Sequence, residues 1–427
     1  MSTLRRELGK WDLTALGVNQ VIGGAVFLMP AILARQIGGW SWVAATAVGL
    51  LAMLIALNFA EAGSRFDGTG GPYLYTRRAF GRFAGFEVGW MLWITRVTSW
   101  ASVVNGLVDA VGYYSPGLRV GALRMTVITV VVIAIMMLNI RGIRQSALAV
   151  NVLTWGKVLP LAVFIIVGLP SVSFGALRPE ETLTWAQIST SALYLIFAYG
   201  GYEVVPVPAG ETKDPARAVP FAMIMTIVIA GLIMTLAQVV AMGTLPGLAA
   251  STTPLADASR LLMGPAGALL LTVGAVISTL GNNVGGALSG SRMLFALSEQ
   301  GDFPRAFASV SARFQTPVTA IVATCLTTLV IALSGSFATL AAVSAVARLL
   351  VYVGTCSSVL ALRRSGPAPF TIAGGPIVPV LALVISCAIL AGASRLQLQV
   401  GVAGIVVGAV LFFVSSAAQP GKPQHAN

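Results

Sequence analysis

Charged residues are scarce in this chain. Lysine, arginine, aspartate and glutamate make up 9% of its 427 residues, whereas 57% are hydrophobic and the mean hydropathy is +0.89. A water-soluble surface needs far more polar side chains than this. The composition therefore excludes a soluble globular protein and predicts a chain that lies in a lipid bilayer.

Cysteine and histidine are also rare. The three cysteines, Cys325, Cys356 and Cys387, are far apart and form no C-x-x-C pair, which excludes a disulfide framework and indicates small core residues. The single histidine, His425, lies in the polar tail "QPGKPQHAN". A membrane enzyme that hydrolyses its substrate with a metal ion would need metal-coordinating side chains, and this chain has almost none of the Cys or His type. We therefore expect neither a metal nor another cofactor.

The sequence lacks the motifs of two further classes of membrane protein. It has no G-x-x-x-x-G-K-[ST] segment, so ATP-driven transport has no support. It also shows no aspartate-rich phosphate site, no histidine cluster and no nucleophile with an adjacent base. We therefore expect that the protein is not an enzyme.

What the sequence does contain is a series of apolar stretches of about twenty residues, the length that crosses a bilayer. We predict an all-α integral membrane protein with about twelve spans and no soluble domain between them. The first stretch is longer than the apolar part of a signal peptide and has no small-residue cleavage site, so we expect it to be retained. The predicted spans are 13–36, 41–62, 83–113, 121–139, 146–169, 186–209, 218–244, 264–297, 317–334, 337–361, 376–394 and 399–416.

The net charge of +12 first suggests a nucleic-acid partner. The basic residues, however, gather in alternate loops between the predicted spans, which is typical of the cytoplasmic side of a membrane protein. The inner side would hold Arg5, Arg6, Lys10, Arg65, Arg77, Arg78, Arg82, Arg141, Arg144, Lys213, Arg217, Arg292, Arg305, Arg313, Arg363, Arg364 and Lys422, and the outer side only Arg35, Arg119, Arg124, Arg178, Arg260 and Arg395. We therefore expect no nucleic acid, a location in the cytoplasmic membrane, and both termini in the cytoplasm.

Two predicted spans contain helix breakers. The first reads "NQVIGGAVFLMP", with Gly23 and Gly24, and the sixth reads "FAYGGYEVVPVP", with Gly200 and Gly201. Opening a helix exposes N–H and C=O groups that lipid cannot satisfy but a polar substrate or a water-filled cavity can. Paired glycines also allow close helix packing, but two matched interruptions, 200 − 23 = 177 residues apart, favour an inverted-repeat transporter with its site between them.

This interpretation divides the single transmembrane transporter domain, 1–427, into parts. The first repeat would occupy 13–169 and the second 186–361. Two additional helices would follow in 376–416, and 417–427 would form a cytoplasmic tail.

Four segments carry a resemblance to a known family. They are "GVNQVIGGAVFLMPAILA", "GTGGPYLYTRRAFGRFAGFEVGWMLW", "FAYGGYEVVPVPAGETKDPARAVPFAM" and "GSRMLFALSEQGDFPRAFASVSARFQTPV". In order and spacing, from about residue 10 to residue 320, the chain resembles amino-acid permeases of the amino acid–polyamine–organocation (APC) superfamily. The resemblance implies a five-plus-five inverted-repeat fold with discontinuous helices 1 and 6, alternating access, and an amino acid held at the two breaks.

The resemblance also assigns residues of the first span. In the family, backbone N–H groups of a Gly-Ser/Ala-Gly triplet bind the substrate carboxylate, and the matching residues here are Gly23, Gly24 and Ala25, directly after Ile22. Ala25 departs from the family pattern. Its N–H group remains available, but its methyl group narrows the approach of a ligand.

In the sixth span, "FAYGG" is similar to the family's "F-x-F-x-G" segment. The resemblance implies that carbonyl groups near Gly200 and Gly201 receive the substrate ammonium and that Phe197 closes over the substrate from the outer side. Phe197 and Tyr199 also fit a role as ordinary packing aromatics. The adjacent glycine pair favours the gate.

Lys157 lies within the predicted fifth span, where inserting a charge costs about 2.5 kcal/mol or more. It resembles the lysine that takes the place of a bound sodium in sodium-independent members of the superfamily and ties spans one and five together. A buried lysine can also release a proton, so a static role and a role in proton coupling are both open. Either role argues against sodium coupling.

Arg96, in the third span, is unusual for the family and falls near the side-chain end of the substrate. It either binds an anionic substrate side chain or pairs with Glu203, and pairing is the commoner fate of intramembrane charges. We therefore expect neutral amino acids first and acidic ones second. Arg348 would line a vestibule or extend toward a lipid headgroup, and Glu61 and Asp67 would belong to an inner gate.

These observations predict a secondary active transporter for amino acids, working as a proton symporter, an exchanger or a uniporter. Two alternatives share the fold: an amino-acid sensor that resembles a transporter, and an exchanger of polyamines or organic cations.

Overall fold

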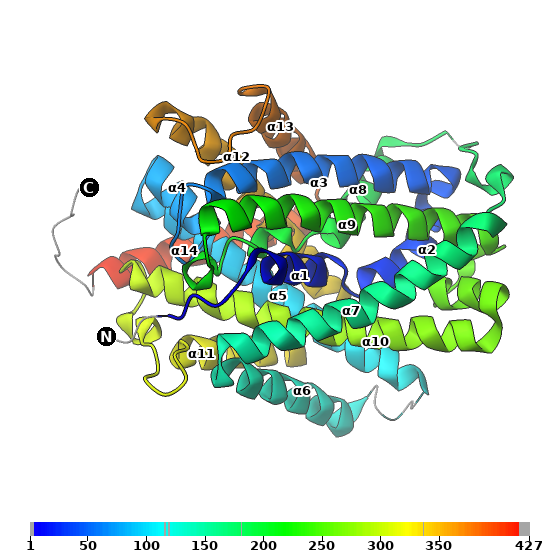
Figure 1. Ribbon diagram of the computed structural model, residues 1–427, viewed down its shortest axis with the longest axis horizontal. Coiled ribbons are helices and arrows are strands. Elements are labelled where there is room, and N and C mark those ends of the chain that lie inside the picture. Colours follow the sequence, from blue (N-terminus) through cyan, green and yellow to red (C-terminus); the bar gives the residue numbers. More distant parts are fainter. Residues whose placement is uncertain (1–3, 115–116, 118–119, 181, 336, 418–427) are drawn as a thin grey trace.

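The computed structural model describes residues 4–114, 117, 120–180, 182–335 and 337–417. His425 and Lys422, discussed above, lie outside these residues, as does Arg119. Throughout the described ranges the chain forms helices and no β-strand, with one parallel bridge between Leu8 and Thr212. The longer helices run side by side in one elongated bundle (Figure 1).

The helices match the predicted spans closely. Ten of the twelve spans coincide with one helix, the first covers two consecutive helices, and the sixth covers one helix and the 3₁₀ turns after it. Within the described residues, seven helical segments are long and apolar enough to cross a membrane by themselves. The prediction of an all-α, multi-pass membrane protein is confirmed, while the division into two repeats stays a prediction. The helices are α1 (Lys10–Val21), α2 (Ala25–Ile37), α3 (Ser41–Gly63), α4 (Pro72–Phe80), α5 (Arg82–Tyr114), α6 (Gly121–Arg141), α7 (Ile143–Gly168), α8 (Trp185–Tyr199), α9 (Pro215–Thr244), α10 (Pro254–Glu299), α11 (Val318–Ser334), α12 (Phe337–Leu362), α13 (Ile377–Ala391) and α14 (Arg395–Ala417).

Two elements differ from the prediction. The segment between the predicted spans 41–62 and 83–113 contains an additional short helix, α4, which begins with Pro72 at the first helical position after Gly71, whose φ is +50°. α10 begins at Pro254, ten residues before the predicted start, because the chain is helical on both sides of Gly264, whose φ of 67° interrupts the helix. Both pieces are too short or too polar to be recognised as a span.

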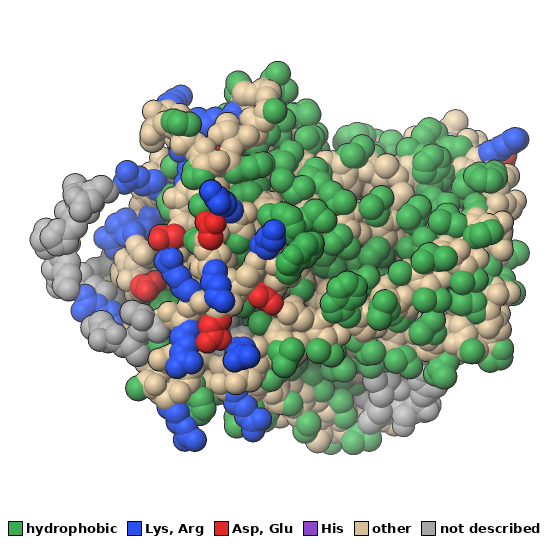
Figure 2. Space-filling model, in the orientation of Figure 1, with side chains coloured by type: hydrophobic (Ala, Val, Ile, Leu, Met, Phe, Trp, Pro, Cys, Tyr) green, Lys and Arg blue, Asp and Glu red, His purple; other side chains and the backbone are tan. Residues whose placement is uncertain are grey.

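Charge is distributed unevenly between the two ends of the bundle. Lysine, arginine, aspartate and glutamate side chains gather at the end where the segment before α1 and the last turn of α14 lie, and few are seen toward the other end (Figures 1 and 2). We call these the charged end and the opposite end. This asymmetry has the form expected from the positive-inside rule.

Candidate functional site

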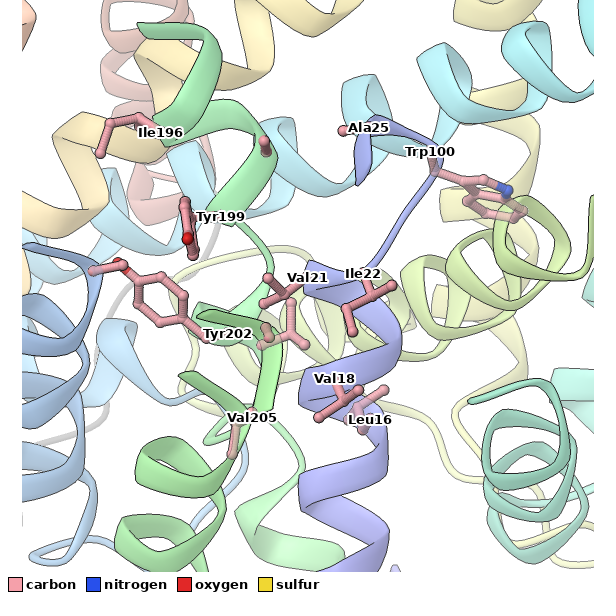
Figure 3. Close-up of a cluster of buried hydrophobic side chains, with 14 of the residues drawn as sticks. Leu16, Val18, Val21, Ile22, Ala25, Trp100, Ile196, Tyr199, Tyr202 and Val205 are labelled. Atoms are coloured by element: carbon pink, nitrogen blue, oxygen red, sulfur yellow. The ribbon is translucent and has the colours of Figure 1, made fainter. Parts of the chain in front are cut away.

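The first span is broken at the predicted glycine pair. α1 ends at Val21, the chain runs without helix through Ile22 and Gly23, and α2 restarts at Ala25 after Gly24 (Figure 3). The first N–H groups of a helix have no carbonyl one turn earlier to bond, and they form the positive end of the helix dipole. The start of α2 is therefore a group of hydrogen-bond donors in the interior of the bundle.

The sixth span is broken at the second glycine pair. α8 ends at Tyr199, Gly200 is extended, and Gly201 has a φ of 137°. The chain continues through two 3₁₀ turns, η5 (Tyr202–Val204) and η6 (Ala209–Glu211), until α9 begins. The prediction that helices 1 and 6 are discontinuous is confirmed.

The two breaks touch each other. A Cβ atom on Gly201 would lie 2.5 Å from the carbonyl carbon of Gln20 and 2.8 Å from the nitrogen of Val21. Figure 3 shows Val21 and Ile22 beside the segment that carries Tyr202. Only a residue without a side chain allows the two main chains to come this close, and here the positive φ requires glycine as well.

A cavity of about 380 Å³ lies beside both breaks. Six of the predicted site residues line it, namely Gly23, Gly24, Ala25, Arg96, Phe197 and Gly200. Ile22, Tyr199 and Gly201 do not. The hydroxyl group of Tyr199 instead donates to the carbonyl of Ala45 in α3 at 2.9 Å, so this side chain packs between helices.

The cavity extends toward the opposite end of the bundle. Thr252 and Thr253, in the loop between η7 (Leu248–Ala250) and α10, form part of its lining. On the other side, Val204, Val205 and Val207 of the sixth span are buried. The described residues therefore hold the cavity in a conformation that reaches one end of the bundle only.

Lys157, on α7, is fully buried and lies behind the break in the first span. Its Nζ donates to the carbonyl oxygens of Asn19 at 2.9 Å, Ile22 at 2.8 Å and Ser278 at 3.1 Å. The ammonium thus joins α1, α7 and α10, whereas the resemblance implied only a connection between the first two of these helices. All three ammonium hydrogens have a carbonyl partner.

Glu203 is the centre of the second buried group. Its Oε1 accepts from Arg96 Nη2 at 2.6 Å and from Arg348 Nε at 2.8 Å. Its Oε2 accepts from the N–H of Gly201 at 2.8 Å and from the hydroxyl of Tyr352 at 3.2 Å. The expected pair between Arg96 and Glu203 is present, and a second arginine shares the same carboxylate.

The sequence left two places open for Arg348, and the structure agrees with the first, because Arg348 lines the cavity. It does not extend toward a headgroup, because its side chain is 1% exposed and its carboxylate partner lies inside the bundle. Its guanidinium contacts Gly200, where a Cβ would lie 2.0 Å from Nη1, and its Nη1 donates to the carbonyl of Phe197 at 3.4 Å. A charge in a span predicted the need for a partner, but nothing in the sequence connects Glu203 with a residue 145 positions later.

The sequence also gave no signal for Asn282 of α10. Its Nδ2 donates to the carbonyl of Gln20 at 2.9 Å, and Gln20 Nε2 donates to the carbonyl of Asn282 at 2.9 Å. The first of these bonds satisfies the Gln20 carbonyl just before α1 unwinds, in place of the bond that a continuous helix would make, and the second joins the Gln20 side chain to α10.

At the charged end, ion pairs close the bundle. Glu61 accepts from Arg363 at 2.7 and 2.6 Å, and this hydrogen bonding raises the pKa of Arg363. Glu211 and Arg292 form a fully buried pair at 3.0 Å. Asp67 forms an exposed contact with Arg6, at 3.3 Å.

Asp302 adds a second group of contacts there. It accepts from the hydroxyl of Tyr73 at 2.6 Å and from Arg82 Nε at 2.9 Å. Burial and the negative charge of Asp302 raise the pKa of Tyr73, so its phenol remains a donor at neutral pH. Across the described residues, no three His, Cys, Asp or Glu side chains are grouped as a metal site would require.

Comparison with known proteins places this architecture in a family. The chain is 25% identical over 444 residues to the branched-chain amino acid permease BcaP of Bacillus subtilis (strain 168), covering 97% of this chain and 94% of that protein. It is 26% identical to the methylthioribose transporter of the same organism, with coverage of 97% and 94%, and 26% identical to its serine/threonine exchanger SteT, with coverage of 95% and 96%.

A family model described as amino acid permease matches residues 8–422, almost the whole chain. This match includes both broken helices and the cavity beside them. It also includes Lys157 with its carbonyl partners, and Glu203 with its two arginines. The protein therefore belongs to the amino acid permease family of the APC superfamily and is an amino-acid transporter, not an enzyme.

Proposed function

We propose that this protein is a sodium-independent secondary carrier that moves α-amino acids across the cytoplasmic membrane by alternating access. The observation that carries this proposal is the cavity bordered by both helix breaks. A substrate there meets main-chain groups that the breaks leave without helical partners. The charged end faces the cytoplasm in this proposal, with both termini on that side.

The main chain would hold the two groups that all α-amino acids share. The N–H groups of Gly24 and Ala25, at the positive end of α2, suit the substrate carboxylate. Carbonyl groups at the end of α8 suit the ammonium, since the last carbonyls of a helix lack the usual intrahelical donor, although that of Phe197 already accepts from Gly200 and Arg348. Phe197 lines the cavity at this point and is placed to cover the substrate.

Lys157 supports sodium independence. Three carbonyl oxygens converge on its ammonium, which is the kind of ligand set that would otherwise bind a small cation. A neutral amine has only two hydrogens and would direct a lone pair at the third carbonyl. In this conformation the geometry thus favours a fixed cation over a group that releases a proton.

Alternating access would require the charged end to open. The pairs of Glu61 with Arg363 and of Glu211 with Arg292 hold it closed while the cavity reaches the opposite end. Exchange of these partners would open the path to the cytoplasm. Proton symport and exchange are both compatible with such a cycle.

The test is uptake of radiolabelled amino acids into proteoliposomes, with and without sodium and with and without an inward proton gradient. We expect saturable uptake or exchange that does not depend on sodium. Absence of both, with correctly folded protein, would reject transport and favour an amino-acid sensor. Stimulation by sodium would reject the role given to Lys157.

Gly24→Val tests the carboxylate subsite. Gly24 has helical angles, and the nearest atom to an added Cβ would be Thr279 Oγ1 at 3.6 Å, so the protein should fold normally. The added side chain would cover the N–H groups and should lower uptake at least about tenfold, equal to 1.4 kcal/mol of binding. Gly231→Ala, in α9 with nothing within 4 Å, is the matched control. Normal uptake by Gly24→Val would reject the subsite.

A further inference from the structure

Among the side chains that the structure describes, the charges beside the cavity do not balance. Arg96 and Arg348 both line the cavity, and both bind the one carboxylate of Glu203. Two positive groups and one negative group leave one positive charge in excess. The preference for neutral substrates was predicted from the sequence on the assumption that Glu203 neutralises Arg96 alone. Because Arg348 shares the same carboxylate, that assumption no longer holds.

Glu203 has no capacity for another partner. An ionised carboxylate offers about four lone-pair sites. Arg96, Arg348, the N–H of Gly201 and the hydroxyl of Tyr352 together make four hydrogen bonds to it. A substrate ammonium therefore cannot use this carboxylate without displacing one of these donors.

The two guanidinium groups, in contrast, have donors to spare. Arg96 Nε is buried and has no hydrogen-bond partner. The contacts of Arg96 Nη1 with Gln20 Oε1 and of Arg348 Nη1 with the carbonyl of Phe197 are both long, at 3.4 Å. A guanidinium is suited to a planar, bidentate partner such as a carboxylate, and a buried charge without a partner is costly.

We propose that Arg96 and Arg348 bind a second carboxylate on the substrate, so that the preferred substrates are acidic amino acids. This inference rests on the proposed function. The α-carboxylate would take the N–H groups at the start of α2, and the side-chain carboxylate would neutralise the excess charge of the arginines. The same excess charge repels lysine, arginine and polyamines, which rejects the organic-cation alternative.

Acid–amide pairs give the direct test, because glutamate and glutamine, like aspartate and asparagine, have nearly the same shape and differ in charge. In proteoliposomes, glutamate should compete for uptake at a concentration at least about tenfold lower than glutamine, a difference of 1.4 kcal/mol. Equal or stronger competition by glutamine would overturn this proposal while the proposed transport function stands. No uptake of either would reject the transport function itself.

Competition by glutarate provides a second test of the proposal. It has two carboxylates at a similar separation and no ammonium. Weak competition by glutarate supports recognition of an acidic amino acid, whereas competition equal to that of glutamate would show a dicarboxylate site and overturn the amino-acid part of the proposal.

Arg348→Gln tests the assignment within the protein. This substitution leaves Arg96 and Glu203 as a balanced pair, so the preference for glutamate over glutamine should fall at least about tenfold while glutamine uptake persists. A purely structural role for Arg348 would lower the uptake of both equally. Arg364→Gln, an exposed site beyond the end of α12, removes the same charge and should change neither. If Arg348→Gln fails to fold, the acid–amide comparison on the unchanged protein decides the question.

Discussion

Replacing Gly201 by alanine should separate the two helix breaks. Gly201 has a φ of 137° and a ψ of −29°, a conformation that costs alanine about 1–3 kcal/mol. The new Cβ would also lie 2.5 Å from the carbonyl carbon and 2.6 Å from the oxygen of Gln20, and 2.8 Å from the nitrogen of Val21. These are main-chain atoms, so the conflict is relieved only by moving one break away from the other.

The cost follows from adding the two effects. Overpacking of this kind costs about 1–3 kcal/mol, so the total destabilisation is about 2–6 kcal/mol. An unfolding entropy of about 2.1 cal/mol/K per residue over 427 residues corresponds to about 1 °C per kcal/mol, so the melting temperature should fall by at least about 2 °C. Transport should also fall, because the displaced break forms part of the cavity wall.

Thermal unfolding in detergent measures the effect through the intrinsic fluorescence of the eight tryptophans. Gly231→Ala is the control, because this glycine is inside α9 and has open space around it, and alanine there should leave stability unchanged or raise it by up to about 1 kcal/mol. The reasoning is refuted if Gly201→Ala melts within about 1 °C of the control and transports normally.

Two further predictions concern the buried charges. Lys157→Ala leaves the carbonyls of Asn19, Ile22 and Ser278 without a donor, at about 1–3 kcal/mol for each one that water does not reach, so it should lower the melting temperature and abolish uptake. Unchanged, proton-dependent uptake by this variant would contradict the role of Lys157. Glu211→Gln leaves Arg292 buried and unpaired and should cost about 3–5 kcal/mol. The double variant with Arg292→Gln should lose less stability, and equal losses in a melting experiment would argue against a buried ion pair.

Local patterns predicted most of the fold. Apolar runs predicted the long apolar helices of the described residues, and the two glycine pairs predicted both breaks, because these features depend on residues that are neighbours in the chain. α4 was missed, since a nine-residue helix with Arg77 and Arg78 in its last turn has neither the length nor the hydropathy of a span. The early start of α10 was missed because Gly264 and Pro265 give the sequence signal of a helix end.

The site was predictable only in part, for a related reason. The main-chain groups at the breaks follow from the glycines, and Lys157 follows from the resemblance. Tyr199 was placed in the site, but its hydroxyl bonds α3 instead. The shared carboxylate of Glu203 could not be predicted, since Arg96 and Arg348 come from helices on either side of it in sequence and meet it only through the packing of α5 and α12.

The division between main chain and side chains at the cavity has an evolutionary consequence. The N–H groups at the start of α2 belong to the backbone, and no point mutation deletes them while the break persists. The charge that the described side chains place next to the cavity, in contrast, is set by Arg96, Glu203 and Arg348, and replacing Arg348 alone changes this net charge from positive to neutral. Under the proposed substrate site, selection can therefore alter which substrates are favoured through very few mutations and keep the scaffold intact. This suits a set of relatives at about 25% identity that carry names as different as branched-chain amino acid permease and methylthioribose transporter.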